Sequence, residues 1–403
     1  MLVVSVKESA PGAAVVDARY FAQTSGRNSP RFIASVRLPP TMLSIAIACS
    51  AAASSSFETV PVIDLSAGRD VTVPAVRSAL ETFGFFYVAK HGVPQTLIDE
   101  QFEQSKGLFA LPPDAKAAMP FNGTLDIGYL GSGGQALDEE STSRDTKEGF
   151  MMTNNGVFDA AFNLSVSDPL DGATLFWPPK DALPEYERVL REYTAQLTAL
   201  NHRLNSLLFA ALGLSEADRI ALARQPFTVT KQLRYVPAEV RPSDQQDQAQ
   251  IGAGAHADWG ALTILATDGQ PGLEVEHPDP KVGWVPVPPR DGCLIINAGD
   301  QITHWTNGAL RSANHRVIVR PEARRPRYST AFFTYFDLHA LVAPLPQFVT
   351  PEKPPMRPTE TTLEYFHFKL TESVGGGKSA DAAELEEMQC EEEEESHPHP
   401  HDE

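Results

Sequence analysis

The carboxyl half of the chain alternates short apolar segments with turn residues at regular intervals. Short segments rich in β-branched and aromatic residues favour β-strands, and several of them in succession are typical of an antiparallel sandwich or jelly roll. The segments expected to form strands are 229–236, 261–266, 272–276, 283–287, 293–297, 314–319 and 328–336. The sequence therefore predicts a mixed α and β fold that is mainly β.

A long amphipathic helix is expected just before these strands. Pro184 suits a first helical turn, and Gly213 ends the segment. Between them, apolar residues recur at helical spacing and form one continuous stripe: Tyr186, Val189, Tyr193, Leu197, Leu200, Leu204, Leu207 and Ala211. Such a stripe predicts a helix that packs against a sheet and supports it.

The amino half is expected to begin its order with a short apolar strand at 60–65. It continues with a helix at 74–82, a strand at 83–88, a helix at 95–111 and mainly loop at 120–180, and a helix near 359–370 follows the last strand. We therefore divide the chain into an extension (1–58), an N-terminal region (59–180), a region of the long supporting helix (181–227), a jelly-roll core (228–336), a C-terminal helix region (337–372) and an acidic tail (373–403).

The net charge of −19 is concentrated at the carboxyl end. Eleven acidic residues and no Lys or Arg lie between Asp381 and Glu403. A run of like charges after three glycines predicts a disordered, solvated tail, and the His-Pro repeat at its end has no residues around it to build a metal site. Because no basic face is visible, we expect no binding to nucleic acid.

The three cysteines, Cys49, Cys293 and Cys390, are far apart in the sequence and indicate neither a disulfide framework nor a zinc site. A reducing compartment fits best, and we expect the cytoplasm. The first 41 residues are Ser- and Ala-rich with five Lys or Arg and two acidic residues, so organelle targeting and a misassigned start both stay open. The apolar run 42–53 is too short to span a bilayer, and we expect no membrane association.

His256 and Asp258 are candidate metal ligands. They follow a small, flexible Gly-Ala segment and lead into a core strand, and alternation places both side chains on one face of the extended chain. A second His-x-Asp triplet, at His277 and Asp279, is followed by proline between two expected strands, so a hairpin turn explains it. Two histidines and one carboxylate form the set that holds Fe(II) with open coordination positions.

Two residues are candidates for the second histidine of that set. His304 lies in a turn-rich stretch, whereas His315 opens a β-branched strand. Rigid elements hold ligands more accurately than turns, which favours His315.

Arg327 and Ser329 are two residues apart on one strand and so point the same way. Their simplest interpretation is a solvated surface turn with Arg324 and Arg325. However, the strand that follows is core-like, so Arg327 stands at the entrance of a buried strand, where a charge needs a partner. A guanidinium and a hydroxyl together suit an anionic cosubstrate with a carboxylate.

With these residues the chain resembles the Fe(II)- and 2-oxoglutarate-dependent dioxygenases of the isopenicillin N synthase-like branch. The resemblance spans roughly residues 59 to 372. It depends on the segments 60–65, 83–88 and 91–94 in the amino half, and on 256–258, 260–263, 297–300, 305–308, 312–317 and 327–329 in the carboxyl half.

The resemblance implies a distorted double-stranded β-helix, a jelly roll, with helices packed behind it. It implies His315 as the third iron ligand rather than His304, and Arg327 and Ser329 as the pair that binds the distal carboxylate of 2-oxoglutarate. Tyr235 resembles a tyrosine that contacts the cosubstrate from a neighbouring strand. The turn at 320–326 is longer than is usual in the family, and the two ends of the chain have no counterpart there.

The function expected from the resemblance is hydroxylation or desaturation of a small molecule within secondary metabolism, by a monomeric enzyme. Fe(II), 2-oxoglutarate and O2 are the expected cofactor and cosubstrates, with succinate and CO2 released and ascorbate as a candidate reductant. Two alternatives stay open: an iron oxidase of the same fold that uses no 2-oxoglutarate, and a non-catalytic β-sandwich binding protein whose polar residues are satisfied in the core. The substrate and the outcome of oxidation are not specified by the sequence.

Overall fold

The computed structural model describes residues 2–10, 13–20, 31–37, 59–121, 127–132, 134, 145–153, 177–236 and 250–374. The chain divides into two compact units, 1–58 and 59–403. In the first, β1 (Leu2–Ala10), β2 (Ala13–Tyr20) and β3 (Arg31–Arg37) form an antiparallel sheet. Most of the expected acidic tail, from 375 onward, lies outside the described residues, as do Cys49, Cys390 and the apolar run 42–53.

The second unit is built around an eight-stranded sheet with the order β4-β5-β13-β10-β15-β8-β7-β6. Only β4 and β5 pair in parallel; the other neighbours are antiparallel. The strands are β4 (Val62–Asp64), β5 (Phe85–Ala89), β6 (Gly128–Leu130), β7 (Lys147–Thr153), β8 (Thr228–Tyr235), β10 (Leu262–Thr267), β13 (Cys293–Ala298) and β15 (Arg327–Thr334).

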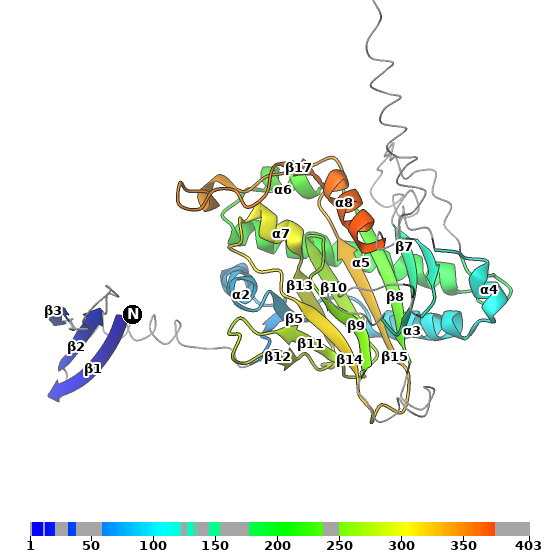
Figure 1. The fold of residues 1–403 in the computed structure, drawn as a ribbon, viewed down its shortest axis with the longest axis horizontal. Helices are drawn as coiled ribbons and strands as arrows, with labels where there is room; N and C mark the ends of the chain where they lie inside the picture. The colour runs from blue at the N-terminus through cyan, green and yellow to red at the C-terminus, as the bar shows by residue number, and fades with distance from the viewer. Residues whose placement is uncertain are drawn as a thin grey trace, which may run out of the picture. The chain divides into compact units, whose positions relative to one another are not determined.

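A four-stranded sheet, β12-β11-β14-β9, lies opposite (Figure 1). Its strands are β9 (Gln250–His256), β11 (Leu273–Glu276), β12 (Trp284–Pro286) and β14 (His315–Val319). Residues from both sheets line one cavity between them. Two facing sheets that are mainly antiparallel, with side chains directed into the space between them, form a jelly roll, so the expected fold class is confirmed.

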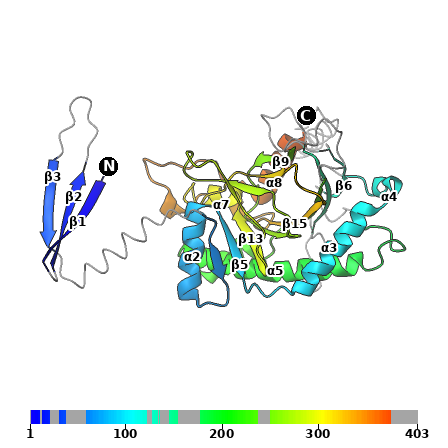
Figure 2. The same ribbon diagram turned by 90° about the horizontal axis from the view of Figure 1, so that it is seen from below.

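Helices cover the other face of the large sheet. Figure 2 shows α5 (Tyr186–Ala211) as a long helix flanked by α2 (Arg69–Thr82) and α3 (Gln95–Ala110), and all three contact one another or the sheet. The predicted apolar stripe of α5 is buried, from Tyr186 to Ala211, and belongs largely to the main hydrophobic cluster. Burial of this stripe supports the sheet from behind and leaves its front face for the cavity.

Shorter elements complete the unit. They are α4 (Pro113–Ala117), α6 (Glu216–Ala223), α7 (Asp300–Trp305), β16 (Leu341–Val342), a 3₁₀ turn η3 (Pro346–Phe348), β17 (Glu360–Thr361) and α8 (Thr362–Val374). No helix in the described part of the chain is both long enough and apolar enough to cross a bilayer.

Some elements differ from the expectations. All seven strands expected after residue 228 are present within one or two residues. The Gly-Ala segment before His256 is not a flexible lead-in but strand β9, and part of the stretch expected as loop forms β6 and β7 at the edge of the large sheet. Likewise the turn-rich stretch that holds His304 contains the short helix α7.

Candidate metal centre and cosubstrate pocket

His256, Asp258 and His315 meet at one point between the two sheets. His256 ends β9 and His315 begins β14, and their Cα atoms are direct partners in the antiparallel pair. Asp258 follows β9 and places Oδ1 3.5 Å from His315 Nε2 and 3.8 Å from His256 Nε2. One ligand atom from each residue lies within 4.8 Å of the other two. Two imidazoles and one carboxylate at this separation fit a single iron ion.

Neighbouring groups hold each of these side chains in orientation. The Nδ1 atom of His256 lies 2.7 Å from the Gly254 carbonyl oxygen, and that of His315 lies 3.1 Å from the Ala313 carbonyl oxygen. A ring nitrogen that donates to a carbonyl leaves the other nitrogen, Nε2, with a free lone pair. Both imidazoles therefore present an acceptor to the same point as Asp258 Oδ1.

The second oxygen of Asp258 is held from behind. Its Oδ2 accepts hydrogen bonds from Thr263 Oγ1 at 2.5 Å and Asn297 Nδ2 at 2.6 Å. The backbone carbonyl of Asp258 accepts from the Asp300 N–H at 2.7 Å. With Oδ2 occupied, the carboxylate is directed to offer Oδ1 as a single ligand.

The electrostatics of the metal-free centre favour a neutral His256 and an ionised Asp258, whereas His315 is favoured in its protonated form and must lose that proton to bind a metal. Burial lowers the pKa of His256 to about 3, with a further contribution from His315, so its imidazole is neutral. Burial alone would raise the pKa of Asp258, but the charge and hydrogen bond of His315 outweigh it and the pKa falls. Burial would lower the pKa of His315, and Asp258 reverses this and raises it. An ionised carboxylate and neutral imidazoles bind divalent ions.

Arg327, Ser329 and Tyr235 lie together on neighbouring strands of the large sheet. Arg327 is opposite Tyr235 in the β15–β8 pair, and its guanidinium carbon lies 4.9 Å from the centre of the Tyr235 ring. Its Nη1 donates to Ser329 Oγ at 3.2 Å, and its Nε donates to the Gln270 carbonyl at 3.3 Å. Within the described part of the chain no carboxylate pairs with this guanidinium, although Arg327 is only 5% exposed. A buried cation in this position fits an anionic ligand.

The candidate ligands His256, Asp258 and His315 and the Arg327 group line one cavity with an empty volume of about 850 Å³, including solvent at its mouth. The rest of its wall is mostly apolar and aromatic, and includes Leu233, Leu265, Trp259, Phe333 and Tyr335. A largely apolar cleft with a few convergent polar groups is typical of a small-molecule site.

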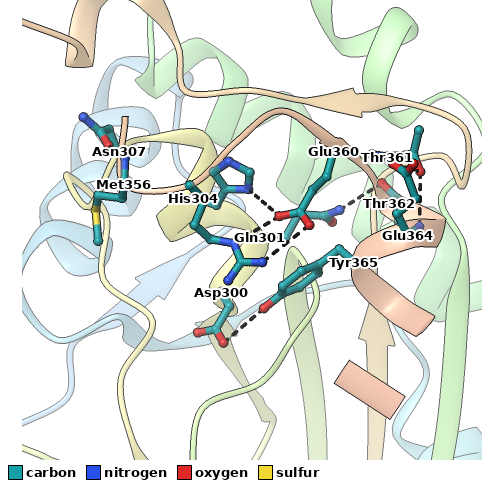
Figure 3. Close-up of polar contacts among 11 residues, drawn as sticks. Asp300, Gln301, His304, Asn307, Met356, Glu360, Thr361, Thr362, Glu364 and Tyr365 are labelled. Atoms are coloured by element: carbon teal, nitrogen blue, oxygen red, sulfur yellow. Dashed lines mark hydrogen bonds and ion pairs between the residues drawn. The ribbon is translucent and has the colours of Figure 1, made fainter. Parts of the chain in front are cut away.

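His304 is not at the metal centre. It lies in α7, with Nδ1 3.6 Å from a carboxylate oxygen of Glu360, in a polar cluster that joins α7 to α8 and the segment before it (Figure 3). In the same cluster Tyr365 donates to Asp300 at 3.3 Å and Gln301 donates to Thr362 at 2.9 Å. The hairpin triplet of His277 and Asp279 is also outside the cavity: the Asp279 N–H donates to His277 Nδ1 within the turn.

Sequence reasoning did not assign roles to Thr263, Asn297 or Lys147. The first two bind the ligand carboxylate, and Lys147 lines the cavity from β7. The alternation of side chains along β10 and β13 was the one available signal for Thr263 and Asn297, since it predicts that both face the cavity. Lys147 carried no such signal because its strand was expected to be loop.

Two family profiles and a curated relative match this chain. The profile of the 2OG-Fe(II) oxygenase superfamily matches residues 229–335, and that of the N-terminal region of non-haem dioxygenases in morphine synthesis matches 60–171. A 2-oxoglutarate-dependent dioxygenase of Didymella fabae is 33% identical over 277 residues, which cover 65% of this chain and 78% of the relative.

Two solved structures have the same fold. A putative 2OG-Fe(II) oxygenase family protein from Caulobacter crescentus superposes with a TM-score of 0.66 at 25% identity, covering 78% of this chain and 99% of that one. JOX2 in complex with 2OG, Fe and JA has a TM-score of 0.61 at 25% identity, covering 79% of this chain and 92% of that one.

The chain belongs to the 2OG-Fe(II) oxygenase superfamily. It is an enzyme, a 2-oxoglutarate-dependent dioxygenase that uses Fe(II) and hydroxylates or desaturates a small molecule. The expected family, enzyme class and cofactors are thereby confirmed, in preference to the non-catalytic alternative.

Proposed function

We propose that His256, Asp258 and His315 hold the Fe(II) of this oxygenase, and that Arg327, Ser329 and Tyr235 bind the distal carboxylate of 2-oxoglutarate. The observation that carries the proposal is the convergence of one ligand atom from each of two histidines and one aspartate within 4.8 Å of one another, in the same cavity as a buried arginine. When bound, iron would activate O2, and oxidative decarboxylation of 2-oxoglutarate to succinate and CO2 would supply two of the four electrons that reduce it.

The residues of the chain contribute orientation and exclusion of water. Arg327 and Ser329 present a guanidinium N–H and a hydroxyl to the carboxylate, and the Tyr235 ring covers the guanidinium from the adjacent strand. A cosubstrate held at one end is fixed before the substrate arrives, which lowers the entropic part of the barrier. Apolar wall residues such as Leu233 and Leu265 limit water at the reacting centre.

The metal roles are tested by iron analysis after anaerobic loading. We expect about one iron per wild-type chain and a loss of most of it in His256→Ala and His315→Ala, whereas His277→Ala, which alters the hairpin triplet, keeps the full amount. Equal iron in wild type and His256→Ala would refute the assignment.

The cosubstrate roles are tested by 2-oxoglutarate binding to the Mn(II)-loaded protein. Loss of a charge-assisted hydrogen bond at a buried site costs about 1.5–3 kcal/mol, so we expect Arg327→Met to weaken binding by roughly 10- to 100-fold. Arg324→Met, on the exposed turn before β15, is the control and should bind normally. Turnover-dependent release of labelled succinate separates this function from the oxidase that uses no 2-oxoglutarate.

We further propose a monomer that acts on a free metabolite in a reducing compartment such as the cytoplasm, without binding nucleic acid or membranes. The acidic net charge of −19 disfavours phosphate-rich partners. The half-buried thiol of Cys293 is not in a disulfide, in keeping with reducing conditions. Size-exclusion chromatography with light scattering tests the oligomeric state.

A further inference from the structure

Strand β9, which ends at the candidate ligand His256, pairs irregularly with its neighbour. Among the strands that the structure describes, β9 lies at the edge of the four-stranded sheet and pairs with β14. Between the pairs His315–His256 and Val317–Ala253, two residues of β9 stand opposite one residue of β14. An extra residue of this kind is a β-bulge, which interrupts the ladder and redirects the side chains beside it. The backbone next to His256 therefore needs support from outside this ladder.

The segment that leads into β7 of the large sheet supplies such support. Asp145 Oδ1 accepts a hydrogen bond from the N–H of Gly254, one of the two bulged residues, at 2.9 Å. Thr146 Oγ1 donates to the carbonyl of Ile251 at 3.2 Å. A buried backbone N–H needs a partner, and the carboxylate of Asp145, which is only 2% exposed, is a charged and therefore strong one.

Gly254 connects this carboxylate to the imidazole of His256. The carbonyl oxygen of Gly254 lies 2.7 Å from His256 Nδ1, while its N–H is held by Asp145. A glycine can adopt many backbone conformations, so its carbonyl has a fixed direction only where neighbouring groups impose one. Because Nε2 lies across the ring from Nδ1, the direction of this carbonyl also sets the direction in which Nε2 points.

Lys147 holds the Asp145 carboxylate in place. Its Nζ lies 2.5 Å from Asp145 Oδ2, and both side chains are buried. Asp145 thus bonds to Gly254 with one oxygen and to Lys147 with the other. The two charges of the pair neutralise each other. We therefore expect the pair to act on His256 mainly through the direction of its hydrogen bonds rather than through net charge.

We propose that Asp145 is a positioning residue of the metal centre. Through Gly254 it fixes the direction in which His256 presents Nε2, and Lys147 keeps its carboxylate in place. The large sheet, which already holds Oδ2 of Asp258, would then orient two of the three ligands. This inference rests on the proposed function, because it assumes that His256 binds the metal.

Two double variants separate the hydrogen bond to Gly254 from the ion pair. Asp145→Asn/Lys147→Met removes both charges and leaves an amide oxygen for the Gly254 N–H. Asp145→Ala/Lys147→Met removes both charges and the acceptor as well. Neither variant leaves one buried charge without its partner, which would destabilise the protein by itself. Co(II) is titrated into each full-length protein, because its visible absorption reports both the affinity and the geometry of the ligands.

We expect the double variant with alanine to bind Co(II) about tenfold more weakly than wild type and with a changed spectrum, since loss of a group that orients a ligand commonly costs about 10- to 100-fold. The double variant with asparagine should stay close to wild type in both. Glu148→Gln is the control. Glu148 follows Lys147 on β7, is buried, and pairs with Lys116 and Arg234. Its loss should lower stability and leave Co(II) binding unchanged.

Three results would overturn the inference. They are wild-type affinity and spectrum in the double variant with alanine, the same change in both double variants, which would assign the effect to the ion pair, and an equal change in Glu148→Gln, which would indicate a general loss of rigidity. If the double variants do not fold, hydrogen exchange of the wild type decides, since rapid exchange at the Gly254 N–H would show that Asp145 does not hold it. Wild-type protein that binds neither Co(II) nor Mn(II) would instead refute the proposed function, and the inference with it.

Discussion

The Asp258 carboxylate depends on two residues that lie behind it. Thr263 and Asn297 both donate to Oδ2 and leave Oδ1 to face the two histidines. Loss of such an outer partner commonly weakens metal binding by about 10- to 100-fold. We expect this loss for Asn297→Ala, measured by Mn(II) titration with electron paramagnetic resonance, whereas Thr263→Ser keeps a hydroxyl donor and should bind nearly as wild type. Unchanged affinity in Asn297→Ala would show that the hydrogen bond does not orient the ligand.

Protonation of Asp337 should make the stability of the protein depend on pH. Burial raises its pKa to about 6, although the backbone N–H groups of Gln225 and Arg224 oppose the rise. The folded state therefore keeps a proton that the unfolded state releases near pH 4, so the contribution of Asp337 to stability falls as the pH rises from about 4 to 6 and stays low above that.

Because Asp337 is partly exposed, solvent screens its charge, and we expect the resulting change in the free energy of unfolding to be only about 1 kcal/mol. Asp337→Asn retains the acceptor for the Gln225 N–H, which lies 2.7 Å from Oδ1, but cannot titrate. The free energy of unfolding of the variant relative to wild type should therefore increase between pH 4.5 and pH 7.5, as measured by urea denaturation. A difference that does not depend on pH would contradict the raised pKa.

Single residues also show what the sequence could predict of the site. His256, Asp258 and Arg327 stood out because their charges or ligand atoms sit beside strands that must be buried, which is a local property. The choice between His304 and His315 needed the resemblance, because both lie beside apolar residues. Lys147 escaped notice because β7 is buried over its whole length and so shows no alternation of polar and apolar residues.

The end of α2 packs closely against the segment that contains Arg311. Gly84 follows α2 with φ of +71°, and a Cβ atom there would lie 2.3 Å from the Arg311 carbonyl oxygen. Gly213 follows α5 with φ of +73° and has no atom within 4 Å of that position. Gly84→Ala should therefore reduce the free energy of unfolding by more than the cost of placing an alanine in the left-handed conformation.

For Gly213→Ala we expect a loss of about 1 kcal/mol, the cost of that conformation for a residue with a side chain. For Gly84→Ala we expect at least about 2 kcal/mol, because backbone must also move. Urea denaturation of both variants measures the difference. Equal losses would mean that the segment at Arg311 shifts freely.

Most strands of the carboxyl half were predictable, whereas β6, β7 and β9 were not. Strands such as β10 and β13 bury large apolar residues, so they carry a strong signal. Strand β9 carries a weak signal because it contains small residues, and at Gly252 the structure explains one of them: a Cβ atom there would lie 2.6 Å from the Tyr235 ring. A segment that looks like a flexible linker is therefore a strand whose glycine leaves room for that ring.

At the scale of the whole molecule, the unit from 59 to 374 combines segments distant in sequence in one sheet. Strand β5 from the amino half pairs with β13, and β7 pairs with β8. The sequence of β5 or β7 alone does not show which strand it pairs with, because the neighbours of a strand depend on the arrangement of the whole sheet. This sheet should unfold as one cooperative unit, so ligands that bind the cavity should stabilise strands that do not touch it.

Ligands that bind in the cavity should therefore raise the Tm of the whole unit. At 100 times its dissociation constant, a ligand stabilises the folded state by about 2.7 kcal/mol, so Mn(II) and then 2-oxoglutarate should each raise the Tm by roughly 4–5 °C in a unit of this size. Arg327→Met should keep the Mn(II) increment and lose most of the 2-oxoglutarate increment, whereas His315→Ala should lose both, because the cosubstrate also needs the metal. Hydrogen exchange should slow in β4 and β5 along with β15 when both ligands are bound. Protection confined to the strands of the cavity would instead mean that the amino half opens independently.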